Sequence, residues 1–392
     1  MSGSSLNVVV AGGGVAGLEA LLALRDLAGH RVDLTLIEPA GQFEFRPMAT
    51  AEAFGRGHGQ RIATERIASD VGANLIRARL TGVDQDQRLA LVEDGDPVPY
   101  DALLVAVGAR GEPAFRRAIT WTPEGDPELF GGLRRDIEEG YASSVAFVVP
   151  PGVAWPLPAY ELALMTAWAA ADMGQKDLRV SIVTPEAAPL DIFGANGSAA
   201  VQEDLDEAGV TVETDAYVTE TDDPPGFAIH PGDRRVEARR VVALPRAVGP
   251  HLSGLPADEH GFIRVNGGCR VLGSERVWAA GDGIAFPIKQ GGLAAQQADA
   301  AAEAIAALAG APVEPHEFRP VLRGILLTGR GSAWLRSHVA GGGGESEAKR
   351  RALWWPPTKV AGRYLAPYLH GTAKQDEQEE PSGQLVEREL RL

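Results

Sequence analysis

The chain contains very little cysteine. Cys269 is the only cysteine among 392 residues, which excludes an intrachain disulfide, a pair of redox-active thiols and a zinc site built on several thiolates. We interpret this single thiol, in the run Asn266–Val271, as a small semi-buried residue rather than a nucleophile. The eight histidines show no spacing typical of metal ligands, so we expect no metal site.

Positive charge and long apolar runs are also scarce. The 37 Lys and Arg residues are outnumbered by 53 Asp and Glu residues, which gives a formal net charge of −16. Neither nucleic acid nor an anionic membrane is therefore an electrostatically favoured partner. No apolar run reaches the roughly 18 residues needed to cross a bilayer. Residues 1–5 are polar, so we expect no signal peptide and a cytoplasmic location.

What the sequence does contain is a glycine-rich turn between a strand pattern and a helix pattern. An apolar run ends at Ala11 and is followed by Gly-Gly-Gly-Val-Ala-Gly, and Glu38 ends the next strand-like run. In such a G-x-G-x-x-G fingerprint Gly12 allows a tight turn, Gly14 lets the backbone approach a pyrophosphate, and Gly17 lets the helix pack on the strand. The helix N-terminus favours phosphate, and Glu38 is placed to bind a ribose. The strand, the helix and the acid together favour a dinucleotide site over a structural turn.

Strands and helices alternate along most of the chain. After the glycine turn we expect a helix within 61–73 and short strands at 74–80, 82–86, 88–93 and 97–100 that form an antiparallel meander. A buried strand ends at Gly108. A second α/β unit follows, with strands at 144–149 and 178–184 and helices near 128–139, 158–173 and 198–208. Residues 34–39 align with residues 180–185, which indicates a diverged internal repeat. A strand ending in Gly281-Asp282 then precedes a helix at 292–309.

The order of these segments resembles the FAD-dependent pyridine nucleotide–disulfide oxidoreductase superfamily. The resemblance covers about residues 1–310 and rests on the glycine fingerprint, the strand end Ala106-Val107-Gly108 and the late Ala-x-Gly-Asp strand. It implies an α/β fold of two interleaved Rossmann-like dinucleotide-binding domains plus a small C-terminal region. The expected FAD domain is 1–110 with 255–310, the second domain is 111–254, and 311–370 forms an interface region before a disordered tail, 371–392.

The resemblance also implies which residues hold the FAD. Asp282 would bind the ribityl chain, and the helix that begins at Gly291 would point its N-terminus at the flavin. Taken alone, Asp282 is equally consistent with a helix cap or a turn residue. The residues expected to contact the cofactor are Gly12, Gly14, Val15, Ala16, Gly17, Glu38, Pro39, Arg46, Pro47, Leu80, Ala106, Val107, Gly108, Gly281, Asp282, Gly292 and Leu293.

Two residues are candidates for the chemistry. The segment 286–298 resembles sulfide:quinone oxidoreductases and type II NADH dehydrogenases, in which a lysine lies beside the flavin. Lys289 would then stabilise negative charge on the flavin, although a solvent-facing loop lysine is the alternative. Glu161, near the start of a helix, is the acid–base candidate, with a helix-dipole contact as the alternative. Gln296 and Gln297 are flavin-side or quinone-side contacts, or simply polar surface.

The second unit lacks its own glycine fingerprint. Ala154, Pro156 and Ala159 stand at the three glycine positions, and Thr184 stands where the first unit has Glu38. Proline has no N–H to offer a phosphate, and side chains obstruct the close approach of a dinucleotide. Binding of NAD(P)H in the usual way is therefore not expected. Sulfide:quinone oxidoreductases resemble this chain in that respect, but their persulfide chemistry requires cysteines that are lacking here.

We therefore expect an FAD-dependent oxidoreductase that takes electrons from a small-molecule donor and passes them to a separate acceptor such as a quinone. An NAD(P)H-dependent reductase with an atypical nicotinamide site and a non-catalytic FAD-binding protein are the alternatives. The aromatic residues of 354–368 suit packing or a homodimer contact better than a peripheral membrane contact, because the prolines among them oppose a long amphipathic helix.

Overall fold

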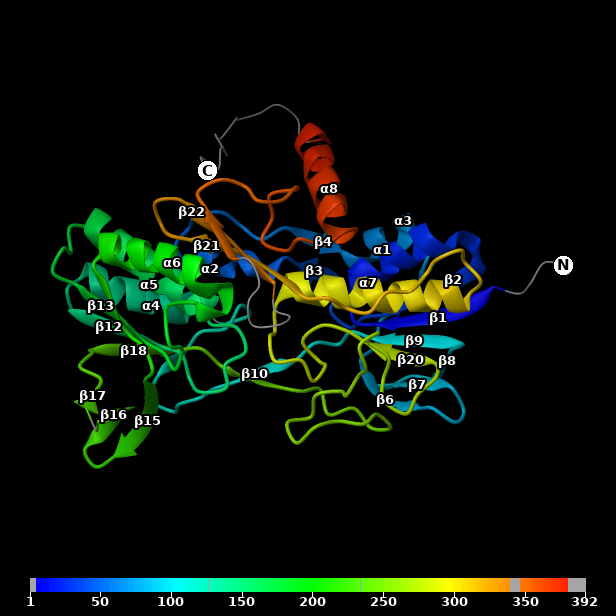
Figure 1. The fold of residues 1–392 in the computed structure, drawn as a ribbon, viewed down its shortest axis with the longest axis horizontal. Coiled ribbons are helices and arrows are strands. Elements are labelled where there is room, and N and C mark those ends of the chain that lie inside the picture. The colour runs from blue at the N-terminus through cyan, green and yellow to red at the C-terminus, as the bar shows by residue number, and fades with distance from the viewer. Residues whose placement is uncertain (1–4, 126, 233, 339–345, 380–392) are drawn as a thin grey trace.

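Two five-stranded parallel sheets organise the molecule (Figure 1), in a computed structural model that describes residues 5–125, 127–232, 234–338 and 346–379. The first sheet has the strand order β20 (Val277–Ala279), β9 (Ala102–Val105), β1 (Leu6–Ala11), β2 (Val32–Ile37) and β5 (Asn74–Ile76). The second has the order β11 (Ile119–Thr120), β18 (Arg240–Ala243), β12 (Ser144–Val148), β13 (Arg179–Val183) and β14 (Val210–Glu213). In each sheet the first β-α-β unit supplies the central strand and its neighbour, as the internal repeat predicts.

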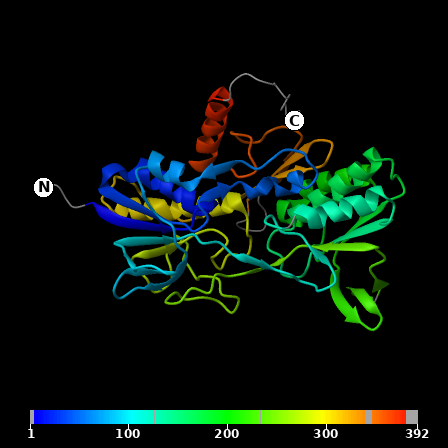
Figure 2. The same cartoon turned by 180° about the vertical axis from the view of Figure 1, so that it is seen from behind.

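The first sheet carries different layers on its two faces. One face packs against α1 (Val15–Ala28) and α7 (Gly291–Leu308), whose alanines allow close approach. The other face packs against the meander β6 (Leu80–Asp84), β7 (Leu89–Val92) and β8 (Val98–Pro99). Figure 2 shows the same two layers from behind. Because both faces are covered, the central strands are apolar without alternation.

The second sheet repeats this arrangement. Its helical face carries α4 (Pro127–Glu138), α5 (Leu157–Asp172) and α6 (Gly194–Ala208). The opposite face packs against a small sheet of β15 (Tyr217–Asp222), β16 (Pro225–His230) and β17 (Arg234–Arg235). Two short antiparallel pairs complete these parts of the chain: β3 (Gln42–Glu44) with β4 (Arg61–Ala63), and β10 (Arg110–Glu112) with β19 (Arg246–Val248). The remaining short helices are η1 (Gly29–Arg31), η2 (Arg46–Met48), α2 (Ala49–Glu52), α3 (Thr64–Asp70) and η3 (Asp191–Phe193).

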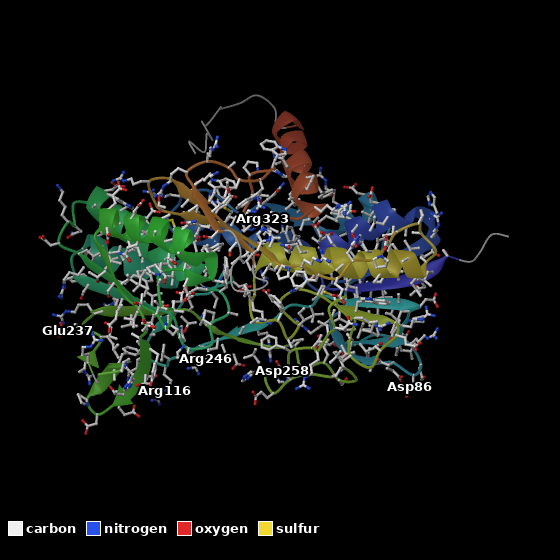
Figure 3. The ribbon with its side chains drawn as sticks, in the orientation of Figure 1. Asp86, Arg116, Glu237, Arg246, Asp258 and Arg323 are labelled. Carbon is white, nitrogen blue, oxygen red and sulfur yellow. The ribbon has the colours of Figure 1, made fainter. Side chains whose placement is uncertain are left out.

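The C-terminal region forms a third sheet, β21 (Val321–Leu327), β22 (Ser332–His338) and β23 (Ser346–Lys349), and then helix α8 (Leu365–Glu379). Strand β21 contacts the start of α7, because the side-chain amide of Gln290, directly before α7, donates to the Arg323 carbonyl at 3.1 Å. Figure 3 labels Arg323 on this strand. Trp334 packs edge-on against Trp354, whereas Trp355 is 75% exposed. The aromatic cluster is thus partly an internal packing element.

Three sequence predictions were wrong in this region and near the first unit. Residues 371–379 are helical, not disordered, because Pro367 lies in the first turn of α8, where its missing N–H costs nothing; residues 380–392 lie outside the described part. Residues 61–63 form a strand rather than the start of a helix. Residues 74–76 join the parallel sheet instead of the meander, because they pair with β2.

Candidate functional site

A cavity of about 1020 Å³ opens at the carboxyl ends of the first sheet's strands. Its walls come from the two five-stranded parallel sheets and from the C-terminal sheet. The first parallel sheet contributes the turns after β1, β2, β9 and β20, the second contributes the turn after β12, and the C-terminal sheet contributes strand β21. Ligands of α/β proteins bind at this edge, where neighbouring connections diverge to opposite faces. Most of the predicted cofactor residues line the cavity: Gly12, Gly14, Val15, Ala16, Glu38, Pro39, Arg46, Pro47, Leu80, Ala106, Val107, Gly108, Gly281 and Asp282.

The glycine turn has the geometry that a pyrophosphate needs. Gly12 has φ of +113° and donates its N–H to the Ile37 carbonyl at 2.8 Å, and a Cβ there would overlap the Ala106 carbonyl. A Cβ on Gly17 would overlap the Gly12 carbonyl, so this glycine sets the approach of α1 to β1. Around Gly14, in contrast, no atom lies within 4 Å of the Cβ position. The N-terminus of α1 is therefore open to an anion, which fits a dinucleotide.

Glu38 lines this cavity beside the glycine turn. Its carboxylate accepts N–H groups from Gly13 and, at 2.7 Å, from Ala40, and its side chain is 9% exposed. These bonds hold the carboxylate beside the glycine turn, at the position from which it can accept hydrogen bonds from ribose hydroxyls. The position agrees with the predicted role, which remains a prediction.

Beside the N-terminus of α1, Asp282 follows β20 and Gln290 precedes α7; a Cβ on Gly281 would lie 3.1 Å from the Ala16 Cβ. The Gly281 N–H donates to Gln297 Oε1 at 2.8 Å, and the Leu293 N–H donates to Gln290 Oε1 at 2.8 Å. Gln290 is thus the N-cap of α7. Burial raises the pKa of Asp282, against the opposing effect of Lys289 and Arg46. The helix N-terminus and Lys289 bring positive charge to this part of the cavity.

Lys289 is not a solvent-facing loop lysine. Its Nζ donates to the Ile284 carbonyl and lies 3.8 Å from the centre of the Phe262 ring. Burial lowers its pKa to about 8, although Asp282 and Asp258 favour the charged form. A cation held in this way has lost part of its hydration and stabilises negative charge nearby more strongly than a solvated lysine does.

Glu161 forms a buried ion pair that the sequence did not predict. Its side chain is 1% exposed, and both carboxylate oxygens lie within 2.7 Å of Lys359 Nζ. The carboxylate also accepts the Thr50 hydroxyl at 2.7 Å and the Leu327 N–H at 2.8 Å. Glu161, Lys359 and Thr50 line the cavity, and they come from the second unit, the C-terminal region and the first unit. Their wide separation in sequence is why sequence reasoning missed Lys359 and Thr50.

A few predicted residues have structural partners instead. Gly17, Gly292 and Leu293 do not line the cavity; Gly17 packs on the glycine turn and Leu293 is fully buried. Gln296 bonds Gly292 and Val321, and Gln297 bonds Gly281, so both glutamines support the site from behind. Gln290 could have been recognised as a polar residue directly before a helix start.

The turn after β12 lines the cavity in a different way from the glycine turn. Val153, Ala154 and Trp155 contribute side chains to the wall, and the Ala154 carbonyl accepts the Lys289 N–H at 3.4 Å. Beyond β13, the Glu186 carboxylate turns inward and accepts the hydroxyls of Tyr160 at 2.7 Å and Thr184 at 2.8 Å. Burial raises the pKa of Glu186 to about 7. Thr184 is the counterpart of Glu38, and the acid nearest to it in sequence, Glu186, is therefore hydrogen-bonded within the second unit.

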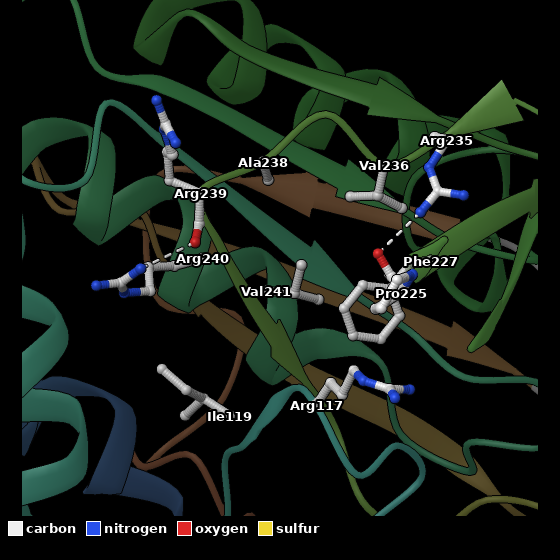
Figure 4. Close-up of a pocket in the computed structure, with 11 residues that line it drawn as sticks. Arg117, Ile119, Pro225, Phe227, Arg235, Val236, Ala238, Arg239, Arg240 and Val241 are labelled. Atoms are coloured by element: carbon white, nitrogen blue, oxygen red, sulfur yellow. Dashed lines mark hydrogen bonds between the residues drawn. The ribbon is translucent and has the colours of Figure 1, made fainter. Parts of the chain in front are cut away.

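Other features of the chain carry less chemistry. Cys269 is 1% exposed and burial raises the pKa of its thiol to about 12, so it is not a nucleophile. A smaller hollow of about 360 Å³ lies between β18 and the β15–β17 sheet (Figure 4), and its Arg117 and Arg240 are paired with Asp222 and Asp136. Across the described ranges, no group of three or more His, Cys, Asp or Glu residues is placed to hold a metal ion. No helix in that part of the chain is long and apolar enough to span a bilayer.

Comparison with known proteins places these observations in context. The model of the pyridine nucleotide-disulphide oxidoreductase family matches residues 6–138 and 161–304, well over half of the chain. The sulfide:quinone oxidoreductase of Aquifex aeolicus has a similar structure, with a TM-score of 0.78 and 19% identity over 95% of this chain and 90% of that one. A ferredoxin reductase of Rhodopseudomonas palustris gives a TM-score of 0.62 at 19% identity, covering 86% and 83% of the two chains.

A curated relative matches a shorter stretch. Hydrogen cyanide synthase subunit HcnB of Pseudomonas protegens is 30% identical over 175 residues, which is 39% of this chain and 34% of the relative. The match therefore spans about a third of that protein.

Proposed function

Because the chain belongs to the pyridine nucleotide-disulphide oxidoreductase family and is an FAD-dependent oxidoreductase, we propose that it passes electrons from a small-molecule donor through the flavin to a quinone. One observation carries the proposal. The cavity lined by the glycine turn is also lined by a cation, a second helix N-terminus and a buried carboxylate–ammonium pair. FAD, when bound there, supplies the uptake and release of two electrons.

Lys289 and the N-terminus of α7 have an electrostatic task in this proposal. Both bring positive charge to the same part of the cavity, and Lys289 is held there by Ile284 and Phe262. Fixed positive charge in a site that excludes water stabilises negative charge as it develops, without any cost of reorienting solvent. These groups would therefore favour the electron-rich form of the cofactor.

Glu161 has the task of handling protons. Its oxygens accept hydrogen bonds from Lys359 Nζ and Thr50 Oγ1, so a proton would have a hydrogen-bonded path among the three side chains. A quinone takes up two protons when it is reduced, and the pair lies on the cavity wall beside apolar residues that suit a quinone ring, Val360 and Ile325. The Lys359 ammonium would supply the first of these protons and would remain as a neutral amine beside the Glu161 carboxylate.

The donor reaches the flavin without help from thiols. The chain has a single cysteine and that residue is buried, so electrons cannot pass through a disulfide formed by two cysteines of this chain. The wall formed by Trp121, Val153 and Leu244 is apolar and offers no cradle for the phosphates of a nicotinamide nucleotide. We propose that the donor is a small molecule other than NAD(P)H.

The test is a pair of anaerobic half-reactions with the FAD-loaded protein. A panel of small-molecule donors is screened for bleaching of the flavin, and the reduced protein is then mixed with a soluble quinone or with a ferredoxin-type protein. We expect rapid reoxidation by the quinone and slower reoxidation in Glu161→Gln, with Glu186→Gln as the matched control. Reoxidation by the protein carrier alone, or no difference between the two variants, would contradict the proposal.

A further inference from the structure

A buried and a half-buried carboxyl group lie where α1 packs on α7. Glu19 on α1 is 0% exposed, and its carboxylate accepts the backbone N–H groups of Tyr364 and Leu365, both at 2.7 Å. Leu365 is the first residue of α8. A carboxylate from the first helix therefore satisfies the N-terminus of the last helix, which is a favourable place for negative charge.

Asp299 on α7 completes the pair. Its carboxyl interacts with that of Glu19, and its Oδ1 is buried and has no hydrogen-bond partner among the described residues. Two neighbouring carboxyls away from water are not both ionised, so a hydrogen bond between them requires one proton. Burial and the neighbouring Glu19 raise the pKa of Asp299 to about 8. Asp299 therefore holds the proton near neutral pH, and Glu19 keeps its charge for the two N–H groups.

The charged groups around the pair act in both directions. Arg363, in the segment before α8, favours the ionised form of Asp299, while Glu303 on α7 opposes it. Arg363 also lies within 3.7 Å of Glu303, which reduces the effect of each on the pair. The His316 Nδ1 lies 3.3 Å from the Glu303 carboxylate, and Asp26 on α1 acts on Tyr364.

The segment that Glu19 holds leads directly to the cavity. Gly362 lies against the Glu19 carboxylate with no room for a Cβ, and Val360 packs on Gly291 at the start of α7. Lys359, the next residue back along the chain, reaches Glu161. Residues 362–365 are thus fixed at one end by the acid pair, and residues 359–360 form one wall of the cavity at the other.

We infer that Glu19 and Asp299 are positioning residues that share one proton and thereby hold residues 359–365 in place, so that Lys359 meets Glu161 in the cavity. Loss of the shared proton puts two negative charges between α1 and α7, and the repulsion weakens the hydrogen bonds to Tyr364 and Leu365. The segment then loosens and Lys359 loses its fixed position. The anchoring itself is independent of the proposed function, whereas its effect on turnover rests on that function.

Hydrogen exchange at the amides of Tyr364 and Leu365 tests the anchoring directly in the FAD-loaded protein. After correction for intrinsic exchange, we expect protection in the wild type to fall roughly tenfold for each pH unit above 8. In Asp299→Asn the amide donates to Glu19 at every pH, so protection stays constant. Asp26 is an exposed acid on α1, the helix that carries Glu19, and the Asp26→Asn variant should behave like the wild type. Equal pH profiles in the wild type and Asp299→Asn would overturn the inference.

Reoxidation by the soluble quinone provides the second readout. Lys289 titrates in the same range, so the comparison is between the two proteins at each pH rather than along one profile. We expect the wild-type rate to fall below that of Asp299→Asn by up to roughly tenfold at one pH unit above 8. If the exchange profiles differ as expected but quinone oxidises neither protein, the proposed function fails and the anchoring stands. If the exchange profiles are equal, the anchoring fails whatever the rates show.

Discussion

The turns that follow β1 and β12 each stand at the carboxyl end of the central strand of a five-stranded parallel sheet, yet they differ in what they present. After β1, glycines leave the α1 N-terminus open, and Gly17 brings the helix against the Gly12 carbonyl. After β12, prolines and Trp155 occupy the equivalent turn, and Ala159 packs against Val149 and Leu244. The first turn offers backbone N–H groups to a ligand, whereas the second offers side chains.

The acids at the ends of the neighbouring strands differ in the same sense. Glu38 follows β2 and is presented to the cavity, whereas Thr184 follows β13 and bonds Glu186, whose carboxylate turns inward to Tyr160. The helix after the second turn has a different contribution, because α5 places Glu161 in the cavity. In the proposed function one unit binds the dinucleotide, and the other supplies the wall and the acid for a different reactant.

Substitution of Gly17, the third glycine of the fingerprint, should have the largest effect on stability and on FAD content. Gly17→Ala places a Cβ on the Gly12 carbonyl, so α1 must move away from β1. We expect a loss of roughly 4 kcal/mol or more in the free energy of unfolding and little bound FAD. The matched change Ala159→Gly should cost only about 1 kcal/mol and leave the FAD content unchanged. Urea unfolding measures the free energy of unfolding, and flavin absorbance after gel filtration measures the FAD content. Equal FAD loss in the two variants would show that the two turns do not differ in their importance for FAD binding.

The ion pair between the second unit and the C-terminal region comes next. Lys359→Met leaves the buried charge of Glu161 without its partner, and we expect a loss of about 3 kcal/mol in the free energy of unfolding. The double variant Lys359→Met with Glu161→Gln should recover a large part of that loss, because no uncompensated charge remains. Denaturation of the three variants measures the coupling. Additive losses would show that the pair is not a unit.

Glu38→Gln sharpens the comparison of the two acids. Replacing a charged acceptor of ribose hydroxyls with a neutral amide should cost about 1.5 kcal/mol, or roughly a tenfold weaker Kd for FAD. Glu186→Gln should leave the Kd unchanged, because Glu186 bonds only to its own unit in the described structure. Fluorescence titration of the apoprotein with FAD gives both constants. A comparable loss in Glu186→Gln would place that acid at the FAD site.

Lys289 gives the smallest expected effect, and it depends on pH. With its pKa lowered to about 8, the ammonium is charged below that pH and neutral above it, so its stabilisation of the reduced flavin is present at pH 7 and lost as the pH rises through 8. We expect Lys289→Met to lower the two-electron midpoint potential by about 30 mV at pH 7 and by much less at pH 9. A pH-independent difference would show that another group sets the potential.

The sequence predicted the parts of the site whose signals are local. The glycine turn, Glu38, the Gly281-Asp282 strand end and the start of α7 are short patterns with a fixed physical meaning, and each lies at the expected end of its strand or helix. Lys359, Thr50 and Glu19 carry no such pattern, because their partners are more than a hundred residues away along the chain. Such contacts depend on how the two parallel sheets and the C-terminal region pack together.

Local signals misled the prediction of the C-terminal end only in part. The prolines of 354–368 predicted no long helix in that range, and only its last four residues belong to α8. The polar, charged composition of 371–392 predicted disorder, yet 371–379 continue α8, whose first amides are satisfied by Glu19 and which has Pro367 in its first turn. A proline in that position is compatible with a helix start. The position of a helix terminus relative to a proline, rather than the presence of the proline, decides the outcome.

The central claim is that the first unit holds a dinucleotide and the second does not. An anaerobic titration of the FAD-loaded protein with NADH and with NADPH, followed by the visible absorbance of the flavin, tests this claim most directly. We predict one FAD per chain and no bleaching at a saturating concentration of either nucleotide, whereas dithionite bleaches the same sample. Rapid, stoichiometric bleaching by NADH or NADPH would contradict the account, because it would require a nicotinamide site beside the turn after β12.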